Sequence, residues 1–230
     1  MASRIEAVNV RPSVGLADIR RYKNTLMTLL LALCVLAATV YLTRPAAVVN
    51  LGQGNPSGLA QLRADWAAGG MIVLVRHVER CDHSKAPCLN AADGITERAR
   101  SVAVGLGAQF ERLGLARTDI YNSPVLRAVQ TSSYMFNSTT TDQDWLFNCK
   151  GTLLRDALAH KVAGRNLVLV THSECMAELE KQLRVSNSDF GYGSALFLST
   201  AKGNARSQLV GYLDAADWRA VFSPSSLAIK

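Results

Sequence analysis

The chain has 230 residues, 49% of them apolar, which is enough to bury the core of one α/β domain with an appendage. Its formal net charge is +7, from 25 Lys and Arg residues and 18 Asp and Glu residues, but six of the basic and only two of the acidic residues lie within residues 1–44. The rest of the chain therefore holds 19 basic and 16 acidic residues without a basic block, which argues against a nucleic-acid-binding protein.

The first predicted element is an apolar helix near the N-terminus. Residues 26–42 are uncharged and almost wholly apolar, and residues 25–43 approach the ~30 Å needed to cross a bilayer. Basic residues precede this helix, so the positive-inside rule places residues 1–24 in the cytoplasm and the later domain in the periplasm. A cleaved signal peptide and a buried core helix are the alternatives. The long basic region and the lack of a small-x-small site before Arg44 favour an uncleaved, single-pass inner-membrane anchor.

Residues 44–56 are rich in Pro, Gly and Asn and are predicted to be a linker to a domain that covers residues 57–230. In that domain, helical and strand patterns alternate. We expect helices over 57–67, 97–113, 152–162 and 174–183, another helix that opens at Ser123-Pro124 with Ser123 as N-cap, strands over 71–75, 119–122 and 167–170, two late strands within 193–213, and irregular structure over 137–150. This alternation predicts an α/β fold, a three-layer α/β/α sandwich around a mainly parallel sheet.

Polar side chains follow three of the predicted strands: Arg76, His77, Glu79 and Arg80 the first, Asn122, Ser123 and Arg127 the second, and His172 and Glu174 the third. In open α/β sheets, ligands bind beyond the carboxyl ends of the strands. If the three strands are parallel neighbours, three arginines and two histidines converge on one crevice. A single histidine after a strand would be taken as structural, so the prediction depends on the three segments together.

The residue types in this crevice suit phosphoryl transfer. Arginine forks match the oxygens of a phosphate, and the predicted helix after Pro124 adds a positive dipole end. A histidine among cations stays neutral and can act as a covalent nucleophile. The arginines then stabilise the charge that spreads over the transferring group. We therefore expect transfer of a phosphoryl group to His77 and then to water, with no metal ion and no cofactor.

The segments "LVRHVER", "NSPVLRAVQTS" and "VLVTHSE" resemble the signature blocks of the histidine phosphatase (phosphoglycerate mutase-like) superfamily, over roughly residues 57–200. The stretch "RHVERCDHSKAPCLNAADGIT", with Cys149 and "THSEC", is similar to the exported lipopolysaccharide core heptose(II)-phosphate phosphatases. The resemblance implies that His77 accepts the phosphoryl group and that His172 stabilises it. It also implies phosphate binding by three arginines: Arg76, Arg80 and Arg127.

The proton donor to the leaving group is not fixed by these motifs. The segment 145–160, where one branch of the superfamily places an acidic donor, contains no Glu. Another branch keeps an acidic residue close to the position of Glu174, two residues after His172. We rank Glu174 first, Asp156 second and Glu79 third. Val78 stands where many members carry Gly, although this position varies between subgroups.

The predicted periplasmic part contains an even number of cysteines, which suits disulfides in an oxidising compartment: Cys81, Cys88, Cys149 and Cys175. The first two close a short loop and are the favoured pair, which leaves the other two for each other. A metal site formed by the first pair with Asp82 and His83 is the alternative, but no second half completes it.

The sequence therefore predicts a membrane-anchored phosphoric monoester hydrolase, with a lipopolysaccharide sugar phosphate as the expected substrate. An anchor holds enzyme and lipid-borne phosphate at one surface and raises their effective concentration. One alternative keeps the chemistry but acts on a small sugar phosphate or a phosphohistidine protein. Another is a catalytically silent, anion-binding envelope protein, against which the presence of both His77 and His172 argues.

Overall fold

The computed structural model describes residues 16–137, 140–185, 189–203 and 207–222, so most of the predicted cytoplasmic stretch 1–24 lies outside the described residues. The chain divides into two compact units, Met1–Arg44 and Pro45–Lys230. In the first unit, helix α1 covers Leu16–Thr43. Its segment Tyr22–Thr43 is long and apolar enough to cross a membrane, and none of it is buried. At about 1.5 Å per residue, this segment reaches the thickness of a hydrocarbon core.

The second unit is built around one six-stranded sheet with the strand order β3-β2-β4-β1-β5-β6. The strands are β1 (Met71–Arg76), β2 (Thr118–Asn122), β3 (Thr141–Asp142), β4 (Asn166–Thr171), β5 (Ala195–Ser199) and β6 (Gln208–Leu213). Strands β3, β2, β4 and β1 pair in parallel, and β5 pairs antiparallel with β1 and with β6. Five of the six strands therefore point the same way, which confirms a mainly parallel sheet.

Helices cover both faces of this sheet. They are α2 (Pro56–Ala67), α3 (Glu97–Leu113), α4 (Leu126–Phe136), α5 (Leu153–His160), α6 (Ser173–Leu183) and α7 (Trp218–Val221), with two short 3-10 helices, η1 (Cys81–His83) and η2 (Asp144–Leu146). Side chains of α2, α3, α4 and α7 share one core cluster with Val73 and Val75 of β1. Side chains of α5 and α6 share the other cluster with Ile72 and Leu74. The three-layer α/β/α sandwich is confirmed.

The central strands are apolar on both faces because both faces are covered. Residues 71–75 of β1 and 167–170 of β4 are all buried, and consecutive residues alternate between the two core clusters. This is the continuous apolar pattern that a doubly covered parallel strand requires. Where the pattern stops, at Arg76 and Thr171, each strand reaches the edge of the sheet.

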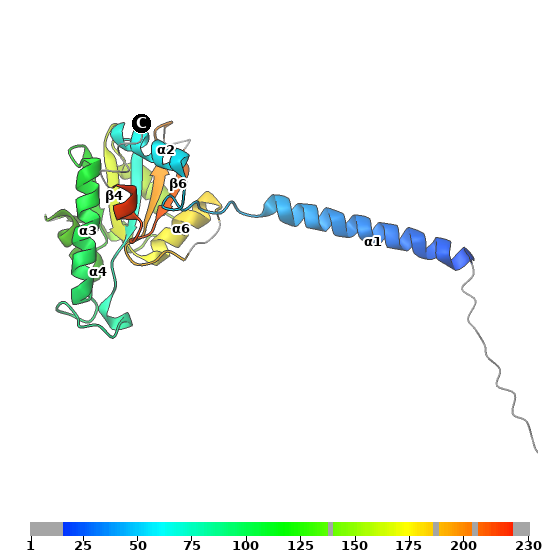
Figure 1. Cartoon of the computed structure of the whole chain (residues 1–230), viewed down its shortest axis with the longest axis horizontal. Helices are drawn as coiled ribbons and strands as arrows, with labels where there is room; N and C mark the ends of the chain where they lie inside the picture. Colours follow the sequence, from blue (N-terminus) through cyan, green and yellow to red (C-terminus); the bar gives the residue numbers. More distant parts are fainter. Residues whose placement is uncertain (1–15, 138–139, 186–188, 204–206, 223–230) are drawn as a thin grey trace, which may run out of the picture. The chain divides into compact units, whose positions relative to one another are not determined.

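Helices α3 and α4 lie side by side, and a glycine sets how closely they pack (Figure 1). Gly107 of α3 is buried, and a Cβ atom at this position would lie 1.8 Å from the carbonyl oxygen of Met135 in α4. Only hydrogen fits between the two backbones here. Because α4 also carries Arg127 in its first turn, the close approach helps to fix the position of that guanidinium group.

Three local predictions need correction. The helix after Ser123-Pro124 begins at Leu126 with Val125 at the N-cap position, so Ser123 does not cap it. Ser123 instead continues the strand direction, with its N–H donating to Val170 O at 2.9 Å. The helix expected over 152–162 is shorter, Leu153–His160. The segment Trp218–Val221, which was not predicted as an element, forms α7.

The segment that was expected to be a linker contributes to the folded domain. Leu51 is fully buried in the core. Its N–H donates to Tyr212 O at 2.8 Å, and the N–H of Tyr212 donates to Val49 O at 2.9 Å, so this stretch runs along β6. Sequence composition suggested a loop because Pro, Gly and Asn break regular structure, but one buried leucine and two backbone hydrogen bonds hold the segment to the sheet.

Candidate active site

The carboxyl ends of β1, β2 and β4 meet at one edge of the sheet. Strand β4 lies between the other two and is parallel to both. The register pairs Arg76 with Thr171 and Asn122 with Val170, so the chain leaves all three strands at nearly the same level. The N–H of His77 also donates to Thr171 O at 2.8 Å. The predicted convergence of the three motifs follows from this register.

The tautomer of His77 is defined by contacts to both ring nitrogens. Nδ1 lies 2.8 Å from the carbonyl oxygen of Val78, which can only accept, so Nδ1 carries the proton. Nε2 lies 3.2 Å from Nε–H of Arg127, which can only donate, so Nε2 carries a lone pair. The side chain is only 2% exposed. His77 therefore presents a neutral imidazole with a nucleophilic Nε2.

Electrostatics keep this imidazole neutral. The pKa of His77 is lowered to about 3, chiefly by burial and also by the positive charges of Arg127 and Arg76, against the raising effect of the Val78 carbonyl. Removing an imidazolium from water next to two guanidinium groups is costly, so the proton stays off Nε2. A histidine with this pKa is available as a nucleophile over the whole physiological range of pH.

Arg76 is oriented by a loop that the sequence motifs did not include. Its Nη1 donates to Phe190 O, and its Cζ lies 4.3 Å from the centre of the Tyr192 ring, over the ring face. The Tyr192 ring also lies 5.6 Å from the His77 ring, centre to centre. Nε of Arg76 is buried and has no hydrogen-bond partner within the described part of the chain.

Tyr192 is thus a site residue that sequence reasoning missed. It precedes β5, which runs antiparallel to β1, so the start of β5 lies at the same edge as the end of β1. A rule that searches only the ends of parallel strands overlooks such a loop. The signal present in the sequence is an aromatic residue between two glycines, Gly191 and Gly193, just before an apolar strand.

Arg80 forms a two-pronged ion pair with Asp82. Its Nε and Nη2 donate to the two carboxylate oxygens at 2.6 and 2.5 Å. Both side chains are partly exposed, so water screens the pair and makes it weak. The charge of Arg80 also lowers the pKa of Arg127, after the larger effect of burial, so the two guanidinium groups lie within electrostatic reach. Two guanidinium groups within electrostatic reach of each other can bind one phosphate between them.

His172 and Glu174 form a hydrogen-bonded pair at the start of α6. Nδ1 of His172 lies 3.1 Å from Oε2 of Glu174, and Ser173 Oγ donates to the same oxygen at 3.1 Å. Burial lowers the pKa of His172, and Glu174 opposes this shift. Burial raises the pKa of Glu174, but hydrogen bonds from its own backbone N–H and from His172 outweigh burial and hold the pKa below its usual range. The carboxylate side chain is 73% exposed and is reached from solvent.

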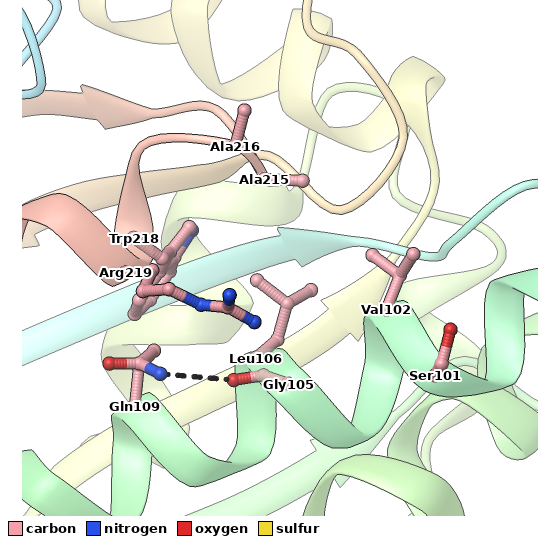
Figure 2. Close-up of a pocket in the computed structure, with 9 residues that line it drawn as sticks. All are labelled: Ser101, Val102, Gly105, Leu106, Gln109, Ala215, Ala216, Trp218 and Arg219. Atoms are coloured by element: carbon pink, nitrogen blue, oxygen red, sulfur yellow. Dashed lines mark hydrogen bonds between the residues drawn. The ribbon is translucent and has the colours of Figure 1, made fainter.

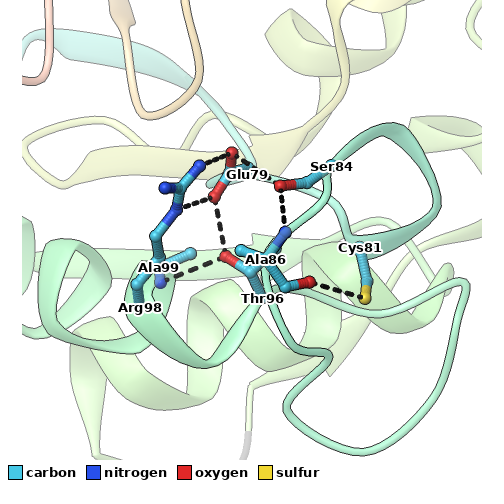
Figure 3. Close-up of polar contacts among 7 residues, drawn as sticks. All are labelled: Glu79, Cys81, Ser84, Ala86, Thr96, Arg98 and Ala99. Carbon is cyan, nitrogen blue, oxygen red and sulfur yellow. Dashed lines mark hydrogen bonds and ion pairs between the residues drawn. The ribbon is translucent and has the colours of Figure 1, made fainter.

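The other two candidate proton donors are engaged elsewhere. Glu79 accepts hydrogen bonds from Arg98 at 2.7 and 2.5 Å, from Thr96 Oγ1 at 2.8 Å and from Ser84 Oγ at 3.1 Å (Figure 3). The hydrogen bonds from Arg98 lower the pKa of Glu79 to about 2 despite burial. Its role is to hold the loop after β1 to the start of α3.

Asp156 lies in the first turn of α5 and contacts residues of its own neighbourhood. Arg155 Nε donates to its Oδ1 at 2.9 Å. Burial raises the pKa of Asp156, but hydrogen bonds from Arg155 and Thr152 outweigh this and lower it. None of the contacts described for Asp156 involves His77, His172 or the three arginines. Of the three ranked acids, Glu174 alone contacts a residue of the predicted site.

Both expected disulfides are present. Cys81 is bonded to Cys88 and Cys149 to Cys175. The sulfurs of the first pair are therefore bonded to each other rather than available as thiolate ligands, which removes the alternative of a metal site with Asp82 and His83. The second disulfide anchors the start of α6, and Sγ of Cys175 lies 3.8 Å from Nε2 of His172.

The six predicted site residues form one electrostatic group. His77 is influenced by Arg76, Arg127 and His172. Arg80 is influenced by Glu174, and Arg127 by both of these. The guanidinium groups of Arg76 and Arg127 next to this buried neutral nucleophile, with Arg80 within reach of Arg127, can hold a phosphate dianion for attack at phosphorus, and the His172–Glu174 pair can carry a proton.

A cavity of about 420 Å³ lies away from this group, between α3 and the segment that leads into α7 (Figure 2). It is lined by Ser101, Val102, Gly105, Leu106, Gln109, Ala215, Ala216, Trp218 and Arg219. Its described lining contains none of the six predicted site residues, and Gln109 satisfies its amide on Gly105 O within the same helix. We assign no part of the chemistry to this cavity.

No protein-family model matches the chain. Among curated proteins, the chain is 30% identical over 158 residues to the lipopolysaccharide core heptose(II)-phosphate phosphatase of Salmonella choleraesuis and 29% identical over 158 residues to that of Salmonella arizonae. Each match covers 67% of this chain and 76% of the relative. The region of similarity thus includes most of the length of these relatives.

Similar solved structures include the protein histidine phosphatase SixA complexed with tungstate, at 13% identity and a TM-score of 0.48. Another is a phosphoserine phosphatase mutant from Entamoeba histolytica in complex with phosphoserine, at 11% identity and a TM-score of 0.46. Each comparison covers 64% of this chain and 98% of the other chain.

Proposed function

Since this chain belongs to the family of the lipopolysaccharide core heptose(II)-phosphate phosphatases, enzymes of the histidine phosphatase type, we propose that it removes phosphate from a lipopolysaccharide core sugar through a phosphohistidine at His77. The observation that carries the proposal is the state of His77. Its Nδ1–H donates to the Val78 carbonyl, and the lone pair on Nε2 accepts from Nε–H of Arg127 at 3.2 Å, so Nε2 is the unprotonated, nucleophilic nitrogen.

In the first step, Nε2 of His77 attacks the phosphorus of the bound monoester. The N–P bond forms as the bond between phosphorus and the sugar oxygen breaks, and the sugar oxygen leaves with the bonding electron pair. Negative charge spreads over the three other phosphoryl oxygens, and the guanidinium groups of Arg76, Arg80 and Arg127 stabilise it. The Val78 carbonyl accepts from Nδ1–H and stabilises the positive charge that develops on the imidazole.

Binding of the phosphate rearranges the charges at the rim of the site. Arg80 exchanges its exposed partner Asp82 for a phosphoryl oxygen, a change that a weak, solvent-screened ion pair permits. The buried Nε–H of Arg76, without a protein partner among the described residues, donates to another oxygen. Because Phe190 O and the Tyr192 ring hold the guanidinium group of Arg76 in place, its unpaired Nε–H is already positioned for an anion before the anion binds.

The departing sugar oxygen takes a proton from the His172–Glu174 pair. In the free protein, the pKa of Glu174 lies below its usual range. A phosphate dianion bound next to the pair raises the affinity of both side chains for a proton, because a like charge disfavours the carboxylate and an opposite charge favours the imidazolium. In the second step, water attacks phosphorus, the N–P bond breaks, and inorganic phosphate leaves. The same pair takes the proton from the water.

The proposed location is the bacterial envelope, with α1 in the inner membrane, the N-terminus in the cytoplasm and the phosphatase domain in the periplasm. One apolar helix, two disulfides and relatives that are named for a lipopolysaccharide substrate support an envelope protein. An anchored enzyme and a lipid-borne phosphate share one surface, which raises the effective concentration of each for the other. We propose that residues 25–43 are this anchor and that it is retained.

The test is phosphate release by the full chain in detergent micelles, with p-nitrophenyl phosphate and with rough-type lipopolysaccharide, in the presence of a chelator. We expect turnover of both by the wild type, no turnover by His77→Ala, and unchanged turnover by His83→Ala, which removes an exposed histidine. Rapid acid-free quenching with radiolabelled lipopolysaccharide should trap acid-labile phosphate on the wild type. Activity that disappears with the chelator contradicts metal-independent chemistry. Turnover of p-nitrophenyl phosphate without release from lipopolysaccharide contradicts the proposed substrate.

A further inference from the structure

A cavity of about 300 Å³ opens beside His172, at the rim of the candidate active site. It is lined by Phe147, Asn148, Cys149, Lys150, Glu174 and Glu178, and we call it the Phe147 cavity. Glu174 belongs both to this lining and to the His172–Glu174 pair, at 3.1 Å from the imidazole. The cavity therefore shares Glu174 with the site where the phosphate is proposed to bind and lies next to it.

Phe147 is the main apolar surface of this cavity. Its side chain is 52% exposed, although it follows Leu146, which is fully buried. The ring lies 6.1 Å from the His172 ring, edge to face, so it stands one ring away from the site of phosphoryl transfer. An exposed aromatic face next to a catalytic centre offers a negative π-surface to C–H groups of a ligand.

The cavity is rigid before any ligand binds. The disulfide between Cys149 and Cys175 ties its outer loop to α6. Oε1 of Glu178, on the same helix, accepts from the N–H of Gly151 at 2.9 Å and from Nε2 of Gln182 at 2.9 Å. A lining that is covalently and hydrogen-bonded in place loses little conformational entropy when it binds a ligand.

The charge of the cavity is opposite to that of the phosphate site. Its lining contains one cation, Lys150, and two carboxylates, Glu174 and Glu178, whereas the phosphate site has three guanidinium groups. A second anionic group is disfavoured here, and hydroxyl groups are favoured, because carboxylates accept from O–H groups and the Asn148 amide both donates and accepts. An apolar ring face bordered by such groups suits the C–H face and the hydroxyl rim of a neutral sugar.

We infer that the Phe147 cavity binds the sugar ring that carries the scissile phosphate, with Phe147 packed against the C–H face of the ring. This inference rests on the proposed function and deepens it, since it divides the substrate between an arginine site for phosphate and a separate site for the saccharide. Phe147 is then the residue that selects sugar phosphates over phosphomonoesters of the same charge without a ring.

The test compares Phe147→Ala with the full-length wild type on two phosphomonoesters: the delipidated, phosphorylated core oligosaccharide of rough lipopolysaccharide, and glycerol 2-phosphate. We expect kcat/KM for the oligosaccharide to fall about tenfold, mainly through KM, and kcat/KM for glycerol 2-phosphate to stay within twofold. Val162→Ala is the matched control, because Val162 is equally exposed at 52% but lies next to Lys161, which contacts Gly69 before β1 at the opposite edge of the sheet. It should change neither value.

An equal loss on both substrates would indicate a structural role for Phe147 and overturn the inference, as would no loss on the oligosaccharide. Tyrosine phosphate is assayed as a third ester, and a loss that is larger on it than on the oligosaccharide overturns the saccharide in favour of an aromatic leaving group. If the wild type hydrolyses neither ester, the proposed function fails. The cavity is then judged by calorimetric binding of the phosphorylated oligosaccharide, which Phe147→Ala must weaken about tenfold for the inference to stand.

Discussion

At the scale of single residues, hydrogen-bond direction decides the chemistry. His77 has a carbonyl at one nitrogen and a guanidinium N–H at the other, so only one tautomer fits. Histidine residues with both nitrogens in contact with acceptors would instead favour the protonated ring. The same reasoning separates the three carboxyl groups: Glu79 and Asp156 are neutralised by arginines outside the site, and Glu174 faces His172.

A first prediction concerns the proton donor. Glu174→Gln should lower kcat for the core oligosaccharide about 100-fold or more, because a sugar alkoxide is a poor leaving group, and should affect p-nitrophenyl phosphate much less. The bound phosphate raises the proton affinity of the His172–Glu174 pair, and the acid form declines as pH rises, so wild-type kcat on the oligosaccharide should fall from acidic to neutral pH, with a flatter profile for p-nitrophenyl phosphate. Steady-state pH profiles measure both effects.

The control is Glu111→Gln, which changes an exposed carboxyl near the C-terminal end of α3 and should leave both pH profiles unchanged. A Glu174→Gln enzyme that loses the same factor on both substrates would assign Glu174 to phosphate or fold rather than to proton transfer.

A second prediction links His77 to stability. The pKa of His77 is about 3 in the folded protein, against an ordinary value of 6.5 in an unfolded chain, so the unfolded chain binds more protons between these pH values. The contribution of the neutral His77 to the free energy of unfolding is fully present above pH 6.5. It is lost as pH falls toward 3, by up to roughly 5 kcal/mol. In phosphate-free buffer, His77→Gln should therefore show a shallower decline of unfolding free energy between pH 6.5 and 4 than the wild type. Denaturant unfolding at several pH values measures the difference.

The exposed residue His83 provides the comparison for this experiment. His83→Gln should give a decline parallel to that of the wild type. Parallel curves for His77→Gln as well would mean that the imidazole is not held neutral by its surroundings.

At the scale of elements, the site depends on how strand ends and helix starts are placed. β1, β4 and β2 deliver their next residues to one edge, α4 brings Arg127 to Nε2 of His77, and α6 begins with the His172–Glu174 pair. The position of α4 relies on its packing against α3 at Gly107. A small displacement of α4 would break the hydrogen bond between Arg127 and Nε2 of His77.

A third prediction tests this packing with two glycines of one helix. Gly107→Ala should destabilise the domain by more than about 1 kcal/mol and lower activity, because the added Cβ would lie 1.8 Å from Met135 O. Gly105→Ala should stabilise it by about 1 kcal/mol, the helix propensity difference, because a Cβ there has no heavy atom within 4 Å. Chemical denaturation and p-nitrophenyl phosphate turnover of both variants measure the contrast. A stabilising Gly107→Ala would refute the close approach.

At the scale of the whole molecule, an apolar helix and a disulfide-bonded phosphatase domain belong to one chain. The apolar segment Tyr22–Thr43 of the helix has no buried residue, and the domain has two core clusters of its own. Disulfides persist in oxidising compartments, which agrees with a domain in the envelope rather than in the reducing cytosol.

A fourth prediction concerns orientation. A C-terminal fusion to alkaline phosphatase should be active in cells, and the same fusion to green fluorescent protein should be dark, because basic residues before the helix retain the N-terminus in the cytoplasm. Deletion of residues 1–43 should reverse both reporters. Full-length protein in the membrane fraction, seen as a band on a gel, would identify an anchor. A shorter form in the soluble fraction would identify a cleaved signal peptide.

The sequence predicted much of the fold because its apolar pattern is local. Buried strands such as 71–75 and 167–170 must be continuous apolar runs when both faces are covered, so their positions can be read without a structure. The cap of α4 could not, because Ser123 and Val125 are both compatible with a helix start until the strand register is known. Leu51 looked like a linker residue because its buried position depends on β6, far along the chain.

The sequence alone determined that Arg76, His77 and His172 stand where apolar strands end, because a strand ends where its buried side chains end, and that Arg127 lies in the helix after another strand. These residue types indicated the class of chemistry. The tertiary structure alone decided which atoms meet. Tyr192 reaches His77 because β5 reverses direction, and Phe147 stands beside His172 because a disulfide joins two distant segments. Such contacts depend on strand order and on the packing of remote parts of the chain, and no local pattern places Tyr192 or Phe147 beside the two histidines, although the cysteines did indicate the disulfide itself.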